Sequence, residues 1–294
     1  MPSIVVTEYT DAACPWAWSA EPAKWRLRWL YGDQLDWRVR MIGLAEDADD
    51  YARRGFTAER MAAGLAQFAA DYGMPMETAP RPRLAATVPA CRAVVAAREH
   101  ASPAAAEALL RRLRIHAMTR ADAVLDDDAT IAAAAREAGL DPDALARWCA
   151  DPDVERALRD DMRQARRPGP AALALRHKLA PTPDGGMRYT APSLVFARVA
   201  DGAVIEAPGF QPSLAYEVAI ANLAPELERR AAPASVAELL AWAGGPLATR
   251  EVAEVLGVRV AEARDRLAQE AGVVAQPAGT DAFWTVPAAD LARA

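Results

Sequence analysis

The chain has 294 residues, of which 52% are hydrophobic and 25% are charged, values typical of a folded globular protein rather than a disordered one. This length allows roughly two domains of about 150 residues each. The formal net charge of −6 argues against general nucleic-acid binding, because such binding needs a basic face that displaces counterions.

The apolar segments are short, and no stretch of about 18 apolar residues occurs. The N-terminus also lacks a basic segment followed by a long apolar one, so we expect neither a membrane span nor a secretory signal. The three cysteines, Cys14, Cys91 and Cys149, are scattered, which excludes a disulfide-stapled secreted scaffold and favours a reducing, cytoplasmic location. None of the three histidines lies at ligand spacing from a cysteine, so we expect no metal site.

The first forty residues alternate between strand and helix patterns. Residues 4–9 are β-branched and aromatic, which predicts a buried strand. Cys14 and Pro15 then precede a helical pattern over residues 16–31, and proline suits the first turn of a helix. Residues 35–41 alternate with period two, as a strand does. Strand, helix and strand in this order predict a parallel pair joined by a right-handed crossover.

The middle of the chain, residues 56–179, has an almost purely helical pattern. Strand character returns at residues 191–197, and Asp201-Gly202 is a hairpin signal before a return strand. A helical pattern over residues 212–227 follows. Strands interrupted by a helical block and resumed by a hairpin predict an α/β domain with a helical insertion.

The C-terminal part follows a linker-like stretch at residues 231–235. We therefore predict one domain over residues 1–230, with the insertion at about residues 46–185, and a second over residues 231–294. The second shows a helix-turn-helix pattern with a hairpin, typical of a winged-helix-like domain. From residue 234 onward its five arginines face eight acidic residues, so we expect protein interaction, dimerisation or a lid role rather than DNA binding.

Cys14 lies where the first predicted strand meets the first predicted helix. Backbone N–H groups and the helix dipole favour a thiolate there, although most cysteines without a disulfide are buried and behave as small apolar side chains. Residues 9–18, with the motif Cys14-Pro15-Trp16-Ala17, resemble the active-site segment of the DsbA family of thioredoxin-fold proteins. The most similar branch is cytoplasmic and bacterial, and includes FrnE-like oxidoreductases, mycothiol-dependent nitroreductase-like proteins and the adaptor that delivers Spx to ClpXP.

This resemblance covers about residues 3–230 and implies a thioredoxin fold with a helical insertion. Residues 190–194 are similar to the family's cis-proline loop. Pro192 would then face Cys14, and together with Ala191 it would present backbone groups to an extended substrate. Further similar segments are residues 35–44, 89–94 and 110–114.

The fourth motif position sets the expected chemistry. Redox members of the family carry Cys-X-X-Cys, whereas Ala17 stands in the place of the second cysteine. Cys14 therefore has no partner for a local disulfide. The resemblance then implies a monothiol oxidoreductase, in which Cys14 forms mixed disulfides with a protein or with a low-molecular-weight thiol of mycothiol or glutathione type. We expect no covalently bound cofactor, and Cys91 is the candidate resolving thiol even though its alanine-rich helix favours burial.

Aromatic residues surround the motif. Trp16 and Trp18 flank the thiol, and we expect them to form an aromatic wall for a ligand. Trp25 and Trp29 are spaced as core residues of a helix.

The sequence does not decide the roles of the charged residues near the motif. Asp11 and Glu21 are the nearest carboxylates, and proton acceptance, helix capping or surface exposure would each suit them. The arginine groups within residues 111–114 and 163–167 would suit an anionic thiol, but solvated helix faces are the simpler interpretation.

Two other classes of function stay open. A non-enzymatic adaptor or chaperone on the same fold would dock partners through the C-terminal module, and Cys14→Ser would leave that binding intact. A kappa-glutathione-transferase or hydroxychromene-carboxylate-isomerase type enzyme would bind a small thiol without redox turnover. A homodimer is compatible with each of these functions, and none of them involves a membrane.

Overall fold

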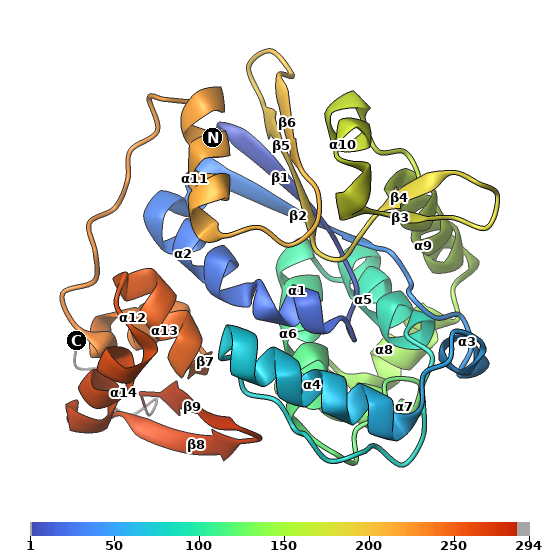
Figure 1. The fold of residues 1–294 in the computed structure, drawn as a ribbon, viewed down its shortest axis with the longest axis horizontal. Coiled ribbons are helices and arrows are strands. Elements are labelled where there is room, and N and C mark those ends of the chain that lie inside the picture. The colour runs from blue at the N-terminus through green and yellow to red at the C-terminus, as the bar shows by residue number, and fades with distance from the viewer. Residues whose placement is uncertain (1, 287–294) are drawn as a thin grey trace.

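The central sheet has four strands in the order β2-β1-β5-β6 (Figure 1). A computed structural model describes residues 2–286. Strand β1 (Ile4–Thr10) runs parallel to β2 (Leu35–Met41), which confirms the predicted parallel pair. Strand β5 (Ser193–Arg198) is antiparallel to β1, and β6 (Val204–Ala207) is antiparallel to β5, as the hairpin signal predicts.

One core lies between this sheet and two helices, α2 (Glu21–Tyr31) and α11 (Ser213–Leu223). Alternate residues of β1 are buried, because successive side chains of a strand point to opposite faces. Ile4 and Val6 pack with Leu27 of α2 and other apolar side chains in this core. The core therefore fixes both ends of the segment that carries Cys14.

The predicted helix over residues 16–31 is wrong in one respect, because it is divided in two. Helix α1 (Pro15–Ser19) ends before Ala20, and α2 begins at Glu21. Pro22 explains the break: it has no N–H to donate to residue 18, and its ring would clash with that carbonyl group in a continuous helix. Because of the break, α1 is a short separate helix, and its N-terminus carries the cysteine motif.

The long insertion between β2 and β5 is mostly helical, as predicted. Its helices are α3 (Asp49–Arg53), α4 (Ala58–Tyr72), α5 (Val88–His100), α6 (Pro103–Thr119), α7 (Asp128–Glu137), α8 (Pro142–Cys149), α9 (Pro152–Ala165) and α10 (Pro170–Ala174). The insertion ends in a small hairpin of β3 (Leu179–Pro181) and β4 (Met187–Tyr189), which the sequence pattern did not predict. Strands of three residues are too short to show period-two alternation.

Up to residue 286, the last one that the structure describes, the C-terminal segment contains three helices and a three-stranded sheet in the order β7-β9-β8. Its elements are α12 (Val236–Ala243), β7 (Leu247–Ala248), α13 (Thr249–Leu256), α14 (Val260–Gln269), β8 (Val274–Ala278) and β9 (Asp281–Thr285). This order agrees with the predicted helix-turn-helix and hairpin, while the winged-helix-like assignment stays a prediction. Residues 287–294 of the predicted module lie outside the described residues.

The C-terminal segment packs beside the cysteine motif rather than apart from it (Figure 1). Helix α13 contacts α2. The tip of the β8–β9 hairpin reaches the segment after α4, where the N–H of Thr280 donates to the carbonyl of Met76 at 3.0 Å and the N–H of Met76 donates to the Thr280 hydroxyl at 3.2 Å. Within residues 2–286, no helix is long and apolar enough to cross a membrane.

Candidate active site at Cys14

Cys14 is the N-cap of α1, directly after the turn that follows β1. Its Sγ donates to the carbonyl oxygen of Ala191 at 3.2 Å, across from the start of β5. The Ala191–Pro192 peptide bond is cis, which confirms the predicted cis-proline loop and its position opposite Cys14. Pro15 occupies the first position of α1, where its missing N–H costs no hydrogen bond.

The thiol of Cys14 is enclosed, with only 5% of the residue exposed. Burial raises its pKa to about 11, because a thiolate loses solvation there. The backbone N–H groups of Ala17 and Trp16 lower the pKa and the Asp11 carboxylate raises it, but both effects are smaller than that of burial. The expected lowered pKa of Cys14 is therefore wrong for this structure, since desolvation outweighs the helix N-terminus.

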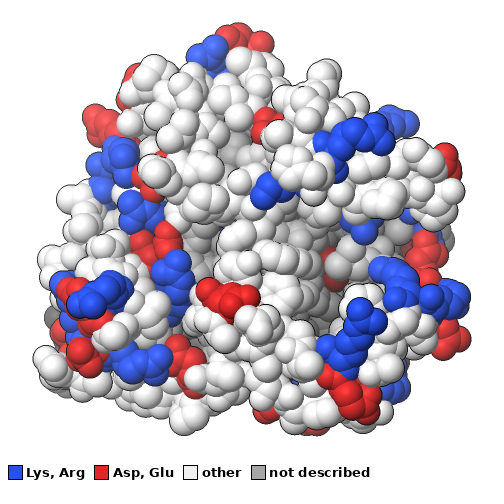
Figure 2. All heavy atoms as spheres, in the orientation of Figure 1, with Lys and Arg blue, Asp and Glu red and all other residues white. Residues whose placement is uncertain are grey.

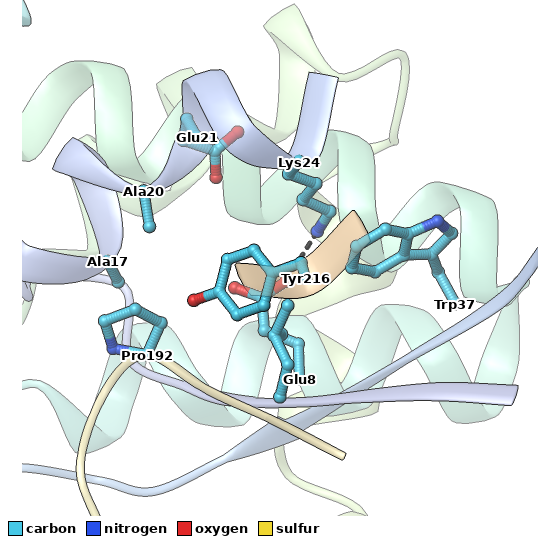
Figure 3. Close-up of a pocket in the computed structure, with 9 residues that line it drawn as sticks. Glu8, Ala17, Ala20, Glu21, Lys24, Trp37, Pro192 and Tyr216 are labelled. Carbon is cyan, nitrogen blue, oxygen red and sulfur yellow. Dashed lines mark hydrogen bonds and ion pairs between the residues drawn. The ribbon is translucent and has the colours of Figure 1, made fainter. Parts of the chain in front are cut away.

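Ala17 lies within the apolar group around the thiol, which we call the Cys14 cluster. Its members are Cys14, Ala17, Ile42, Ala165 and Ala191, with Tyr9 and Leu44 packed against them. The methyl group of Ala17 also borders a cavity of about 20 Å³, enough for one water molecule (Figure 3). A position that would carry the second thiol of a Cys-X-X-Cys motif is here apolar.

The cavity is backed by buried charges that the sequence analysis did not identify. Glu8 accepts from Lys24 at 2.6 Å, and both side chains line the cavity with Tyr216 (Figure 3). Burial opposes ionisation of Glu8, but Lys24 and Arg114 hold its pKa below the ordinary value. The buried hydroxyl of Tyr216 has no hydrogen-bond partner within residues 2–286. Only the even-numbered burial pattern of β1 could have indicated that Glu8 points inward.

Arg114 of α6 is buried and Arg111 is held in ion pairs, contrary to the simpler interpretation that these arginines form a solvated helix face. Arg114 is 1% exposed and pairs with Glu8 and Glu21. Arg111 donates to Glu251 of α13 at 2.6 and 2.7 Å, and to Glu21 at 3.4 Å. Glu21 is therefore part of an ion-pair network that joins α2, α6 and α13, and it is not a proton acceptor for Cys14.

Asp11 organises the loops beneath the thiol. It is fully buried and accepts hydrogen bonds from the N–H groups of Ala13 and Leu44, both at 2.8 Å. Its Oδ2 also accepts from the Thr87 hydroxyl at 2.8 Å and from the Cys91 thiol at 3.4 Å. With these four donors, Asp11 fixes the position of the loops and does not face the substrate side of Cys14.

Cys91 is fully buried, as its helix led us to expect. Burial raises the pKa of its thiol well above the ordinary value. The thiols of Cys14 and Cys91 hydrogen-bond to different partners, Ala191 and Asp11 respectively. Cys149 is partly exposed at the end of α8, and burial raises the pKa of its thiol to about 11. None of the three cysteines forms a disulfide bond.

Trp16 within the motif and Trp18 just after it have different environments. Trp16 is 42% exposed, and its ring lies 4.8 Å from Phe68, 5.4 Å from Tyr72 and 5.5 Å from Phe210 by ring centroids. These four rings form an aromatic surface beside Cys14, whose partners from α4 and from the loop after β6 the sequence could not identify. The face of the molecule that Figure 2 shows has a hollow near its middle, where most atoms belong to uncharged residues and charged side chains lie around the rim.

Trp18 was predicted to bind substrate, and this is wrong because it is fully buried. Its Nε1 donates to the Pro75 carbonyl at 3.0 Å, and its ring packs against Phe283 of β9. The guanidinium of Arg111 lies 4.9 Å from the ring centroid. Trp18 lies on the face of α1 opposite to that of Trp16, so its side chain connects α1 to the C-terminal segment. Trp29 is 2% exposed and Trp25 is packed against the same core, as predicted.

Comparisons with known proteins found a matching family and several similar folds. The family model of the DSBA-like thioredoxin domain matches residues 5–169, more than half of the chain. A DsbA oxidoreductase candidate from Streptomyces coelicolor is 22% identical, with a TM-score of 0.54 over 76% of this chain and 91% of that chain. A candidate protein disulfide isomerase from Nitrosomonas europaea is 16% identical, with a TM-score of 0.54 over 76% of this chain and 96% of that chain. At these identities the two structures show the fold alone.

The search of curated proteins returned no significant match. Within residues 2–286 no group of three or more His, Cys, Asp and Glu side chains is placed to hold a metal ion. Cys14 at the N-terminus of α1, opposite a cis-proline loop, agrees with the family match. The chain belongs to the DSBA-like thioredoxin domain family.

Proposed function

We propose that the protein is a monothiol thiol–disulfide oxidoreductase in which Cys14 forms a mixed disulfide with its substrate. The contact between the Cys14 Sγ and the Ala191 carbonyl, at 3.2 Å beside cis Pro192, carries the proposal. The thiol lies against the backbone edge along which an extended substrate would bind. The aromatic surface around Trp16 would bind the apolar part of that substrate.

The reaction consists of two exchanges. The Cys14 thiolate attacks one sulfur of a disulfide R–S–S–R′, so that the Cys14–S–S–R bond forms and R′S⁻ leaves and takes up a proton. A second thiol then attacks the sulfur of R, which releases Cys14 as a thiolate and gives a new disulfide. The protein gains and loses no electrons over the cycle.

We assign the second step to an external low-molecular-weight thiol of mycothiol or glutathione type. Ala17 offers no sulfur, and Cys91 is enclosed and held by Asp11. Such thiols are abundant in a reducing compartment, which is consistent with a cytoplasmic location and with the cytoplasmic branch that the motif resembles. We treat residues 231–294 as a separate module that supports α1 through Trp18, rather than as a DNA reader, because its hairpin tip is already bound to Met76.

The test is turnover of a small disulfide in the presence of excess thiol. Activity of the full chain is expected to be lost in Cys14→Ser and kept in both Cys91→Ala and Cys149→Ser. Loss of turnover in Cys91→Ala, with the fold intact by circular dichroism, would move the resolving step to Cys91. Full turnover in Cys14→Ser would reject the proposal.

Three observations favour a second candidate, a thiol-independent adaptor. Cys14 is enclosed, its pKa is raised to about 11, and Ala17 replaces the second cysteine. An adaptor would keep its partner binding in Cys14→Ser, and the wild-type protein would show no disulfide turnover. The turnover assay therefore separates the two functions.

A further inference from the structure

Helix α1, which carries Cys14 at its N-cap, depends on its neighbours for its position. It has only five residues, and a helix of that length is not stable by itself. Its buried residues are Ala17, Trp18 and Ser19, of which only Trp18 is large. The Trp18 ring is fully buried, and its Nε1 donates to the Pro75 carbonyl at 3.0 Å. The position of α1 therefore depends on the groups that fix Trp18.

Arg111 of α6 lies against the ring of Trp18. The central carbon of its guanidinium is 4.9 Å from the Trp18 ring centroid, 5.8 Å from that of Phe283 and 5.9 Å from that of Trp25. A cation at such distances from an aromatic ring is attracted to the ring face. Arg111 thus contacts three rings, of which α1, α2 and β9 contribute one each.

The C-terminal segment supplies the carboxylate that holds Arg111. Glu251 of α13 is fully buried, and its two carboxylate oxygens accept from Arg111 at 2.6 and 2.7 Å. Its Oε2 also accepts from the N–H of Ala248 at 2.7 Å, which fixes the carboxylate to the N-terminus of α13. The carbonyl of Pro246 accepts from Arg111 at 3.2 Å. A bidentate pair restricts the guanidinium to one geometry, so Arg111 is fixed relative to α13.

The position of Trp18 is connected to the enclosure of the thiol through α1 itself. Cys14 is 5% exposed because it packs with Ala17 and Ala191 in the Cys14 cluster, and its Sγ donates to the Ala191 carbonyl at 3.2 Å. Ala17 directly precedes Trp18 in the same short helix. A displacement of Trp18 would therefore move Ala17 and the N-cap away from Ala191.

We propose that Arg111 is a positioning residue through which the C-terminal segment holds α1 in the arrangement that encloses Cys14. While Glu251 holds Arg111, the thiol stays enclosed. When this contact is loosened, α1 moves more freely and water reaches the thiol. The inference deepens the proposed function, on which it rests, because it names the contact that controls the reactivity of the proposed nucleophile.

The test measures the rate constant for alkylation of Cys14 by iodoacetamide in the full chain between pH 7 and pH 10, by mass spectrometry of the Cys14 peptide. Arg111→Gln and Glu251→Gln should each react about tenfold faster than the wild type at pH 7, because a thiol in contact with water ionises more readily. Their rates should bend towards a plateau near pH 10, whereas the wild-type rate should still rise steeply there. This bend distinguishes easier ionisation from a general gain in accessibility.

The double variant Arg111→Gln/Glu251→Gln tests whether the two residues act through one contact. Its alkylation rate at pH 7 should exceed that of either single variant by less than about twofold, because each single substitution already breaks the pair. Multiplied effects, with a rate about a hundredfold above the wild type, would contradict the inference.

The matched control is Arg26→Gln, which loosens a different contact of the C-terminal segment. Arg26 lies in α2 and donates to Glu217 at 2.6 Å and to the Glu254 carbonyl of α13 at 2.9 Å. Its side chain is 23% exposed, and that of Arg111 is 14% exposed. Arg26→Gln should leave the pH profile of Cys14 at the wild-type position.

The outcomes separate this inference from the proposed function. Wild-type profiles in both Arg111→Gln and Glu251→Gln would overturn the inference, and so would an equal shift in Arg26→Gln. Glu251→Gln preserves the shape of the buried side chain, so it decides the question even where Arg111→Gln fails to fold. The same proteins are also treated with neutral bis(2-hydroxyethyl) disulfide. The absence of a mixed disulfide on Cys14 in all of them rejects the proposed function, whatever the alkylation profiles show.

Discussion

The thiol of Cys14 lies 3.2 Å from the carbonyl oxygen of Ala191, the residue that precedes cis Pro192. In the present structure this carbonyl is the hydrogen-bond acceptor of the thiol, and burial raises the pKa of the enclosed sulfur. A substrate that takes the backbone edge near Ala191 would replace this hydrogen bond. The chemistry of the site therefore depends on how the enclosed thiol becomes a thiolate.

The first prediction concerns pH. Because burial raises the pKa of Cys14 to about 11, the thiolate is a small fraction at neutral pH. The alkylation rate of Cys14 by iodoacetamide should rise about tenfold per pH unit between pH 7 and pH 10. Mass spectrometry of the Cys14 peptide measures this rate, and the partly exposed Cys149 is an internal comparison. A rate that is already at its plateau at pH 7 would show a lowered pKa and contradict the burial argument.

The second prediction restores the missing sulfur. Ala17→Cys should form a disulfide with Cys14, because both positions belong to one buried cluster at the start of α1. Titration of accessible thiols before and after mild oxidation should then show two thiols lost, together with a gain of dithiol oxidase activity. Ala17→Ser is the control of similar size and should gain neither property. If the introduced thiol stays reduced, the backbone no longer supports the two-cysteine geometry.

The third prediction compares Trp16 and Trp18, the two tryptophans of α1. Trp18→Ala should lower the free energy of unfolding by about 3–5 kcal/mol, because it empties a fully buried site between α1 and β9. Trp16→Ala should lower it by about 1–2 kcal/mol, because it removes only aromatic contacts at the surface. Urea unfolding measures both values. Trp16→Ala should in addition slow the reaction with an apolar disulfide, and a larger stability loss for Trp16 than for Trp18 would reverse our assignment.

The fourth prediction tests the contact of the C-terminal hairpin. A Cβ atom on Gly279 would overlap the Met76 carbonyl group, so Gly279→Ala must displace the hairpin tip. Gly244→Ala is the control, since Gly244 also has a positive φ but has open space around its Cα.

Both substitutions carry a similar cost from the left-handed backbone, about 1–2 kcal/mol. Gly279→Ala should cost about 1–3 kcal/mol more, because the crowded contact must give way. Limited proteolysis should cut the C-terminal segment of this variant earlier than that of Gly244→Ala. Equal stability and equal proteolysis of the two variants would show that the hairpin tip is not held by Met76.

The sequence predicted the parts of the site that local pattern determines. β-Branched and aromatic residues located β1, period-two alternation located β2, and the Cys14-Pro15 dipeptide located the start of α1. The cis-proline loop followed from a resemblance to the family rather than from the residues themselves, because most X–Pro bonds are trans.

The rest could not be predicted, because it depends on which faces of the helices meet. Trp16 and Trp18 are two residues apart on a short helix, and only the position of β9 decides that Trp18 is the buried one. Arg114 reads as a surface residue until Glu8 and Glu21 are seen to surround it. The raised pKa of Cys14 depends in the same way on burial, which a helix N-terminus does not reveal.

The most direct test of the account is to trap the mixed disulfide on Cys14. The full chain is incubated with a small disulfide at pH 8, the remaining thiols are blocked, and the peptides are analysed by mass spectrometry. We predict an adduct on Cys14 that is released by added thiol and is absent from Cys14→Ser, with Cys91 unmodified. An unmodified Cys14 under conditions that label Cys149 would contradict the central claim that Cys14 is the reacting thiol.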